Sequence, residues 1–266
     1  MSLKLAIAGA AGRMGRELAK IVHETEGCVL AGGLEAPSSS HVGADYGDLI
    51  GVGKLGIAIS ADAASVISKV DGVIDFTIPA ATLSLLKHTG GKIHVIGTTG
   101  IDAAGDAAIA EASRSATIVK TGNFSLGVNM LAALVKRAAA ALGQEFDIEV
   151  LEMHHRMKTD APSGTALLLG KAAAEGREIS LNDKSVRVRD GYTGARNIGD
   201  IGFASLRGGT VVGDHSVIFA GNGERLELRH VAESRELFAR GAVKAAVWAT
   251  DQKPGLYSMF DVLGIS

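Results

Sequence analysis

The stretch Leu3-Lys4-Leu5-Ala6-Ile7-Ala8-Gly9-Ala10-Ala11-Gly12-Arg13-Met14-Gly15 is an apolar run that leads directly into a glycine-rich turn. Residues 3–8 are apolar apart from Lys4, which is typical of a strand buried on both faces of a parallel sheet. Over residues 13–24 the apolar side chains recur along one stripe and predict a helix. A strand that passes through closely spaced glycines into a helix favours an α/β nucleotide-binding domain.

Strands and helices continue to alternate from this stretch to residue 125. Further strands are predicted over residues 29–34, 57–59, 73–76, 93–96 and 117–119, helices over 62–69, 79–89 and 103–114, and a loop over 36–53. Such alternation implies an α/β fold with a Rossmann-like, doubly wound parallel sheet whose crossover connections are right-handed.

The pattern changes after residue 125. We expect helices over residues 127–141, 164–175 and 234–249, and strands over 146–153, 185–189, 201–206, 216–220 and 225–231. Gly221-Asn222-Gly223 predicts a tight hairpin between the last two strands. We therefore expect a dinucleotide-binding domain of residues 1–125, completed by 235–266, and an inserted α+β domain of residues 126–234 with a mixed sheet.

Composition narrows the class of protein. The 266 residues are 47% hydrophobic and 21% charged, which is enough apolar material for a sizeable core. A net charge of −2 argues against a general nucleic-acid binder. Cys28 is the only cysteine, so no internal disulfide or cysteine-based zinc site can form. No apolar run reaches about 18 residues and the N-terminus lacks a signal pattern, so we expect a cytoplasmic protein without membrane contact.

Three glycines of the opening turn suit a bound dinucleotide. Gly9 can make the tight turn, Gly12 lets the backbone approach a pyrophosphate, and Gly15 permits close contact between helix and strand. The helix N-terminus, which begins at Arg13, would then face the phosphate charge. The alternative is a plain strand–helix turn without a ligand, with Arg13 on the helix surface.

Residues after three later strands extend this hypothesis. Glu35 can accept hydrogen bonds from both ribose hydroxyls of NAD, or it can be a solvated loop residue. Gly97-Thr98-Thr99-Gly100 lies where a nicotinamide would bind, or forms an ordinary turn. Thr121-Gly122-Asn123-Phe124-Ser125 can contact the nicotinamide amide through its backbone, or act as a domain hinge.

A cationic segment follows the strand predicted at 146–153. It reads His154-His155-Arg156-Met157-Lys158-Thr159-Asp160-Ala161-Pro162-Ser163-Gly164-Thr165-Ala166. Adjacent residues of a strand point to opposite faces, so the two histidines should have different roles. The helix start at Ser163 offers amide groups and a positive dipole end to a carboxylate, assisted by Lys158 and Thr165.

Clustered cations in this segment should lower the pKa values of their histidine and lysine members, which suits a general acid near neutral pH. Several alternatives remain open. The histidines could be structural, or a metal pair, although i,i+1 spacing is poor for chelation and no set of acids or histidines completes a site. Asp160 fits an organising role or a cap better than acid catalysis.

The segment from Glu152 to Ala166 resembles the signature of the bacterial dihydrodipicolinate reductase family. The resemblance covers nearly the whole chain and extends to residues 9–15, 97–100, 123–125, 201–204 and 223–226. It implies an NAD(P)H-dependent oxidoreductase of the diaminopimelate and lysine pathway, which delivers hydride to ring C4 of a cyclic unsaturated imine. It also implies a homotetramer assembled through the sheet of the inserted domain, and a small dicarboxylate substrate.

The resemblance assigns roles to individual residues. His154 is similar to the main acid that completes the reduction, and Lys158 to the second catalytic cation. His155, Gly164 and Thr165 match positions that bind a substrate carboxylate. The matching cofactor contacts are Gly9, Ala10, Ala11, Gly12, Arg13, Met14, Glu35, Gly97, Thr98, Thr99, Thr121, Gly122, Asn123 and Phe124.

Two positions depart from the family pattern. Many relatives have arginine after the ribose-binding acid, where it can meet the 2′-phosphate of NADP, but this chain has Ala36 and no lysine or arginine over residues 36–41. We therefore predict that NADH is preferred, with NADPH accepted through serine hydroxyls or His41. Thr121-Gly122 replaces the usual alanine-rich or proline-containing pair, which affects fine positioning only.

Two other functions fit parts of this pattern. Another two-domain NAD(P)-dependent oxidoreductase could act on a different small acid, although the run from Lys158 to Thr165 argues against it. A non-catalytic dinucleotide sensor would need the glycine turn and Glu35, but it would not need the histidines and Lys158.

Overall fold

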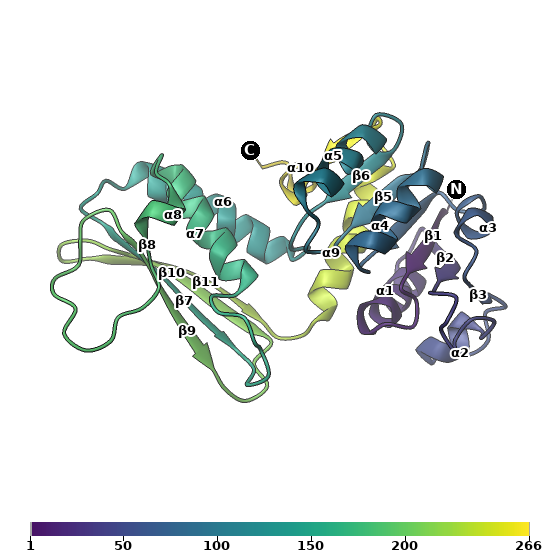
Figure 1. Cartoon of the computed structure of the whole chain (residues 1–266), viewed down its shortest axis with the longest axis horizontal. Helices are drawn as coiled ribbons and strands as arrows, with labels where there is room; N and C mark the ends of the chain where they lie inside the picture. The colour runs from purple at the N-terminus through teal and green to yellow at the C-terminus, as the bar shows by residue number, and fades with distance from the viewer. Residues whose placement is uncertain (1, 266) are drawn as a thin grey trace. The chain divides into compact units, whose positions relative to one another are not determined.

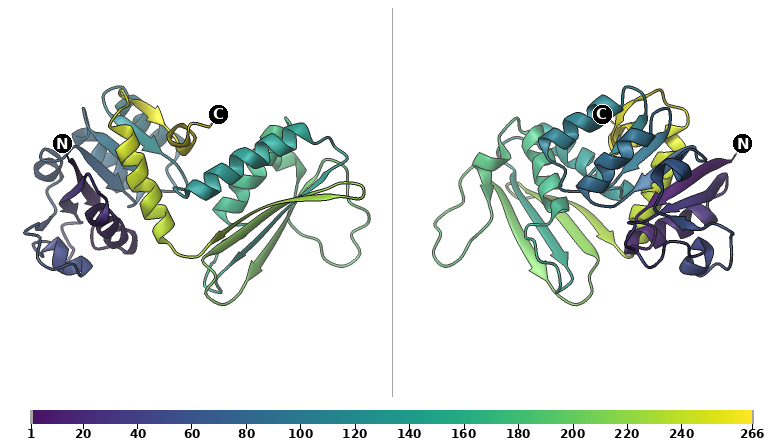
Figure 2. Two further views of the ribbon diagram at one scale, coloured as in Figure 1. Left: turned by 180° about the vertical axis from the view of Figure 1, so that it is seen from behind. Right: turned by 45° about the vertical axis from the view of Figure 1, so that its right-hand side comes forward.

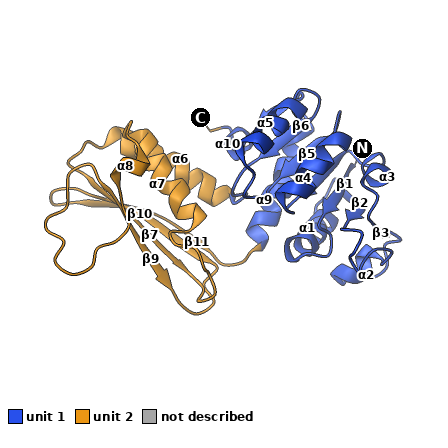
Figure 3. Cartoon of the chain, viewed as in Figure 1, with its two compact units in different colours: residues 1–125, 236–264 blue, residues 126–235, 265–266 orange. Residues whose placement is uncertain are grey.

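The computed structural model of the chain describes residues 2–265 (Figure 1). The chain divides into two compact units (Figure 3). Unit 1 contains residues up to Ser125 together with Glu236–Gly264, and unit 2 contains Leu126–Arg235. No helix in the described part of the chain is long and apolar enough to cross a membrane.

Unit 1 is built on a seven-stranded sheet in which every neighbouring pair of strands is parallel. The strand order is β12-β6-β5-β4-β1-β2-β3. The strands are β1 Leu3–Ala8, β2 Cys28–Leu34, β3 Ile59–Ser60, β4 Gly72–Asp75, β5 Ile93–Ile96, β6 Thr117–Lys120 and β12 Gly255–Tyr257. Since all these strands run the same way, their carboxyl ends meet at one edge of the sheet, where ligands of doubly wound folds bind.

Helices cover both faces of this sheet. Helices α4 and α5 lie on one face, and α1 and α9 pack together on the other (Figures 1 and 2). The helices are α1 Arg13–Glu24, α2 Tyr46–Ile50, α3 Ala63–Ile67, α4 Pro79–Leu85, the 3-10 turn η1 Leu86–His88, α5 Ala103–Ala112, α9 Glu236–Ala249 and α10 Met259–Leu263. The predicted Rossmann-like, doubly wound sheet is confirmed.

Unit 2 contains a five-stranded mixed sheet in the order β11-β10-β7-β9-β8. Strands β7 and β9 are parallel, whereas β10 runs antiparallel to both of its neighbours, as the mixed-sheet prediction requires. Helices α6 and α7 pack on each other beside the sheet (Figure 2). The elements are α6 Leu126–Ala141, β7 Asp147–His154, α7 Gly164–Gly176, α8 Leu181–Lys184, β8 Ser185–Val186, β9 Ile201–Arg207, β10 Gly213–Ala220 and β11 Arg225–Ala232.

The predicted loop over residues 36–53 is wrong in its second half, which contains α2. Asp45 starts this short helix, because its carboxylate accepts hydrogen bonds from the amides of Gly47 at 2.8 Å and Asp48 at 3.2 Å. Gly51 ends it with a φ of 80°. A single turn carries too little hydrophobic periodicity to be recognised in a glycine-rich stretch.

Two predicted strands need correction, and three short elements were missed. The strand predicted over residues 57–59 is β3, which begins only at Ile59. The strand predicted over 185–189 ends at Val186, and helix α8 before it was not predicted. Beyond the end of this edge strand, the guanidinium of Arg189 binds Glu149, with both nitrogen–oxygen distances at 2.8 Å. The last two elements, β12 and α10, were also missed, because each is too short to show a period.

Candidate active site

Two positions of the glycine turn in unit 1, Gly9 and Gly15, require a residue without a side chain. Gly9 has a φ of 70°, in the left-handed region that favours glycine. An ideal Cβ at Gly15 would lie 2.0 Å from the carbonyl oxygen of Gly9, so only glycine lets α1 pass this close to the turn. Gly12 precedes α1 without a side-chain cap, which leaves the first turn of the helix open to an anion.

The amides of the turn divide into two groups. Those of Gly9 and Ala10 donate to the carbonyl of Leu34 at 2.9 and 3.0 Å, and Gly12 donates to Gly9 at 3.0 Å. The amides at the start of α1, which include Arg13 and Met14, have no acceptor within the helix. The geometry therefore favours the helix start, rather than residues 9–12, as the donor of hydrogen bonds to a phosphate.

Glu35 is fixed against this turn. Its Oε1 accepts a hydrogen bond from the amide of Ala11 at 2.8 Å, and its Oε2 accepts one from the amide of Ala36 at 3.2 Å. A cavity of about 520 Å³ opens beside it at the carboxyl edge of the sheet. Its lining is Ala8, Gly9, Gly12, Leu34, Glu35, Ala36, Pro37, Ala61, Ala63, Phe76, Thr77, Ile78, Ala81, Ser84 and Leu85, with no lysine or arginine among these described residues.

This cavity combines the size and chemistry that a nucleoside requires. A carboxylate stands at one side and mostly apolar side chains form the rest, so a ribose and a flat base can both be accommodated. Phe76, Thr77 and Ile78 were not predicted as site residues. The signal was present, however, because they directly follow β4 at the same sheet edge as Glu35.

Thr98 holds the backbone of the site rather than offering a free hydroxyl. It is buried, and its Oγ1 accepts hydrogen bonds from the amide of Thr77 at 3.1 Å and from the hydroxyl of Thr82 at 2.8 Å. The same oxygen lies 3.3 Å from Oδ1 of Asp75, to which it donates. Asp75 in turn lies beside buried His94, with a nitrogen–oxygen distance of 3.5 Å. Thr99, the next residue, is exposed at the sheet edge.

The turn after β6 is folded by its own hydrogen bonds. The amide of Asn123 donates to Oγ1 of Thr121 at 3.3 Å, and Oδ1 of Asn123 accepts from the amide of Ser125 at 2.8 Å. The ring of Phe124 is buried and packs against Phe76, with ring centroids 5.3 Å apart. A cofactor could therefore contact this turn only through backbone, Asn123 or Thr121, and not through the Phe124 ring.

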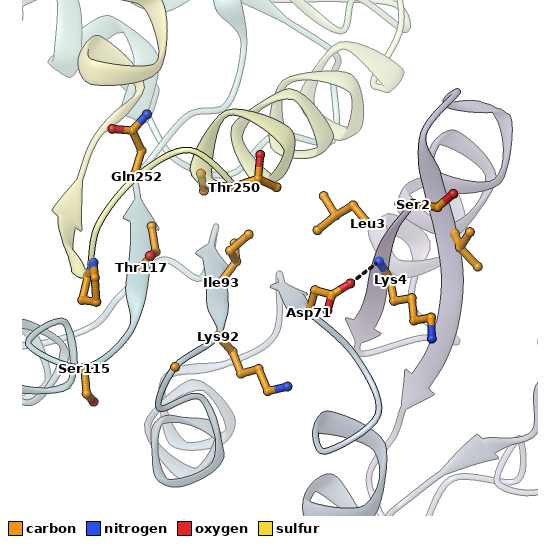
Figure 4. A pocket seen from close by; sticks show the side chains of 14 residues that line it. Ser2, Leu3, Lys4, Asp71, Lys92, Ile93, Ser115, Thr117, Thr250 and Gln252 are labelled. Carbon is orange, nitrogen blue, oxygen red and sulfur yellow. Dashed lines mark hydrogen bonds between the residues drawn. The ribbon is translucent and has the colours of Figure 1, made fainter.

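A larger cavity of about 980 Å³ lies at the opposite, amino-end edge of the same sheet (Figure 4). Its polar groups already serve the fold: Asp71 accepts a hydrogen bond from the Lys4 amide at 2.8 Å, and Lys92 donates to the carbonyl of Val70 at 2.7 Å. Because ligands of doubly wound sheets bind at the carboxyl ends of the strands, we place the cofactor site at the smaller cavity.

In unit 2, strand β7 carries the predicted acid into a buried position. Its buried face presents Ile148, Val150, Glu152 and His154 in turn, so the pattern changes from apolar to ionisable at the end of the strand. His155 is half-buried and on the other side of the chain, with its Nε2 3.4 Å from Arg235. The two histidines therefore have different surroundings, as the strand geometry predicts.

Glu152 organises the environment of His154. Its Oε2 accepts a hydrogen bond from Nδ1 of His154 at 2.6 Å and from Arg207 at 2.8 Å. Its Oε1 accepts from the other Arg207 nitrogen at 2.9 Å and from the amide of Ser163 at 3.2 Å. Arg207 was missed because β9 brings it here from far along the chain, in register with His154.

Burial and hydrogen bonding set the pKa values of this group. Burial alone would raise the pKa of Glu152, but hydrogen bonds from Arg207 and His154 lower it to about 2, so it stays ionised. Burial is the main reason that the pKa of His154 is lowered, and Glu152 opposes this effect. The sequence predicts that nearby cations lower this pKa. Lys158 and Arg207 do lower the pKa of His154, but less than burial does.

His215 is the second buried imidazole of the site. Its ring meets that of His154 edge to face, with centroids 5.0 Å apart, and its Nε2 lies 3.1 Å from Oγ of Ser163. Burial, followed by the charge of His154, lowers the pKa of His215 to about 4, so it is neutral near pH 7. The sequence motif did not include it, because β10 supplies it through the register of the sheet.

Lys158 and the start of α7 complete the group. The ammonium of Lys158 donates to Asp160 Oδ1 at 2.8 Å, which confirms an organising contact for Asp160. Ser163 caps α7, since its hydroxyl accepts from the amide of Ala166 at 3.1 Å. Gly164 faces open space at the first position of the helix, and Thr165 follows it half-buried. A cationic site beside a helix N-terminus suits a carboxylate.

Within the described residues, no group of three or more histidine, cysteine, aspartate or glutamate side chains is arranged to hold a metal ion. The site is thus described by its carboxylate, imidazole and ammonium groups, which can bind an anion and hold a proton at a defined atom.

Comparisons with known proteins agree with this chemistry. The family model for the N-terminus of dihydrodipicolinate reductase matches residues 3–124, and the model for its C-terminus matches residues 127–263. A protein of Rhodopseudomonas palustris strain BisB18, named 4-hydroxy-tetrahydrodipicolinate reductase, is 59% identical over 266 residues and covers 99% of this chain and 98% of its own. A protein of Brucella abortus strain 2308 with the same name is 59% identical over 265 residues, covering 98% and 99%.

A solved structure is similar over the same length. Dipicolinate-bound dihydrodipicolinate reductase from Paenisporosarcina sp. TG-14 matches with a TM-score of 0.75 and 23% identity, covering 97% of this chain and 98% of that chain. At this identity the likeness supports the fold, while the family models and the relatives at 59% identity establish the relationship. The chain therefore belongs to the dihydrodipicolinate reductase family.

Proposed function

We propose that this protein is a 4-hydroxy-tetrahydrodipicolinate reductase, which uses a reduced nicotinamide dinucleotide to form tetrahydrodipicolinate for diaminopimelate and lysine biosynthesis. The observation that carries the proposal is the buried imidazole of His154, held by Glu152 beside Lys158 and the N-terminus of α7. The full-length identity of 59% to relatives with this name supports the same activity.

Unit 1 would hold the cofactor. The start of α1 at Arg13 and Met14 would bind the pyrophosphate, Glu35 the ribose, and residues 97–99 and 121–124 the nicotinamide end. The open helix start and the carboxylate-lined cavity fit such a molecule, and a Cβ at Gly15 would destroy the turn. The bound cofactor would supply the hydride for the reaction.

Unit 2 would hold the substrate and supply the proton. Amides at Gly164 and Thr165, with the Thr165 hydroxyl and Lys158, would bind one carboxylate of a small dicarboxylate, and His155 would assist. Because Glu152 occupies Nδ1 of His154, the proton would leave from Nε2. On the dehydrated ring, whose 4-hydroxyl has left as water, hydride addition at C4 and this proton together complete a two-electron reduction. The dipicolinate in the Paenisporosarcina relative is consistent with a dicarboxylate ligand.

The direct test is NADH oxidation with freshly generated 4-hydroxy-tetrahydrodipicolinate, the product of the preceding synthase, as substrate. We expect rapid loss of NADH absorbance with the wild-type protein and none without substrate. Other small cyclic imines and keto acids should be poor substrates at equal concentration. Binding of NADH without oxidation in the presence of the synthase product would contradict the proposal and favour a dinucleotide sensor.

We further propose that NADH is preferred over NADPH. The cavity beside Glu35 has no cation among its described lining residues, and the carboxylate would repel a 2′-phosphate. Replacing exposed Ala36 by arginine should raise kcat/KM for NADPH about tenfold and leave kcat/KM for NADH within about threefold. Steady-state kinetics with both cofactors check this, and higher kcat/KM with NADPH in the wild type would show that Glu35 does not set the preference.

We also propose a cytoplasmic homotetramer assembled through the sheet of unit 2. Leu206 and Val231, which are 49% and 50% exposed, lie in one row with Met153 and Asp214 across the side of the sheet opposite Glu152. The exposed apolar side chains in this row favour burial against another subunit. A mass measurement in solution distinguishes a tetramer from a monomer.

A further inference from the structure

A row of ionisable groups crosses the buried side of the unit 2 sheet. In the sheet register, Arg207 of β9 pairs with His154 of β7, and His215 of β10 pairs with Glu152 of β7. The side chain of Glu152 is only 1% exposed, at a strand position where Ile148 and Val150 supply apolar core. Burying a carboxylate here costs free energy unless its lone pairs accept hydrogen bonds. This cost indicates that the charge of Glu152 has a role besides packing.

The hydrogen bonds of Glu152 fix the proton of His154. An ionised carboxylate can only accept, and its Oε2 lies 2.6 Å from Nδ1 of His154. Nδ1 must therefore carry a hydrogen whether the ring is neutral or charged. The proton that can be given to a substrate, or regained, is the one on Nε2.

Arg207 connects this arrangement to Lys158. One guanidinium binds both oxygens of Glu152, at 2.8 and 2.9 Å, which prevents the carboxylate from rotating. The same Arg207 donates to the main-chain carbonyl of Asp160 at 2.6 Å, and Asp160 Oδ1 accepts from Lys158 at 2.8 Å. The imidazole and the ammonium are thus positioned through one shared arginine.

We propose that Glu152, clamped by Arg207, is a positioning residue that keeps the Nδ1 hydrogen of His154 in place and makes Nε2 the acid of the reaction. The role of His154 as the acid rests on the proposed function, whereas the position of the hydrogen on Nδ1 rests only on the contact with Glu152. Glu152 itself contacts neither substrate nor cofactor in this assignment.

The charge of Glu152 also sets the pH range over which His154 is protonated. The charged or titratable groups around this ring are Glu152 on β7, Arg207 on β9, His215 on β10 and Lys158 in the loop. Glu152 alone among them raises the pKa of His154, while burial and the cations lower it. An acid must be protonated to act, so kcat should fall as pH rises through the pKa of His154. Without Glu152 that fall should occur at lower pH.

The first experiment compares Glu152→Gln with Glu149→Gln. Glu149 lies on the same strand and also binds arginines, Arg189 and Arg196, but on the opposite side of the sheet. We expect Glu152→Gln to lower kcat about 10- to 100-fold, to leave KM for NADH unchanged, and to move the high-pH fall of kcat down by about one unit. Glu149→Gln should change neither kcat nor the pH at which kcat falls. An unmoved pH profile in Glu152→Gln would overturn the proposal.

Glu152→Asp tests the charge of the carboxylate separately from the length of the side chain. The shorter carboxylate keeps the negative charge, so the pH profile should stay near that of wild type, while kcat falls because the bond to Nδ1 lengthens. A purely structural role predicts instead that both variants lose thermal stability with no difference between their pH profiles, which would contradict the proposal.

An experiment on the resting protein does not depend on activity or on the Glu152 variants. Nitrogen NMR of the labelled protein, with His154 assigned by comparison with His154→Gln, reports which ring nitrogen carries the hydrogen. We expect the Nδ1–H form in wild type; the Nε2–H form would overturn the proposal. Absence of NADH oxidation would count against the proposed function alone, because the ring state is read without substrate.

Discussion

Lys158→Ala should lower kcat about 100- to 1000-fold while the dissociation constant for NADH stays within about twofold. The ammonium is one of the two candidate catalytic cations, and its side chain is 20% exposed, held by Asp160 at 2.8 Å. Removing it deprives the substrate site of a fixed positive charge and of a proton donor. Rapid-kinetic measurement of turnover, with NADH binding followed by fluorescence, checks both halves of the prediction.

Lys171→Ala is the matched control for this change. Lys171 lies on α7 of the same unit and also faces an acid, with its nitrogen 3.9 Å from Glu175, but its side chain is 70% exposed. An exposed pair of this kind contributes little, so turnover and stability should remain close to wild type. If Lys158→Ala weakened NADH binding and kept normal turnover at saturation, Lys158 would belong to the cofactor site instead.

The main elements of unit 1 follow from local patterns in the sequence. The run from Leu3 to Gly15 is a strand, a glycine turn and a helix for reasons that lie within the run itself, namely apolar periodicity and the space that a Cβ would fill at Gly15. Short elements such as α2 could not be predicted in this way, because their stability comes from a cap at Asp45 and from packing.

The candidate site was only partly predictable, because its members come from three strands. The segment from His154 to Thr165 is contiguous and could be recognised, but Arg207 and His215 reach it through sheet register, which one sequence does not reveal. The pKa of His154 is lowered mainly because the ring is buried, and burial depends on how the strand packs. Thr98, predicted as a cofactor contact, is likewise buried: its hydroxyl binds Asp75, Thr77 and Thr82, so a contact with the cofactor would have to come from its backbone.

Gly15→Ala should damage cofactor binding and stability together. The new Cβ would lie 2.0 Å from the carbonyl oxygen of Gly9 and 2.9 Å from that of Ala10, and both are backbone atoms that cannot rotate away. Helix α1 must therefore move from the turn, which also disturbs the 3.0 Å hydrogen bond from buried Tyr46 to the Gly15 carbonyl. Overpacking of this kind costs about 1–3 kcal/mol, and we expect a lower Tm and a tenfold or greater rise in Kd for NADH.

Gly90→Ala separates this steric cause from a general effect of losing glycine. Gly90 is exposed in the same unit, and the nearest atom to its ideal Cβ is Ser115 Oγ at 3.7 Å, an ordinary contact. Its Tm and NADH affinity should match wild type. Because the imidazole and ammonium lie in unit 2, Gly15→Ala should raise KM for NADH far more than it lowers kcat at saturating cofactor. Equal behaviour of the two alanine variants would mean that the turn at Gly9 does not control how the cofactor binds.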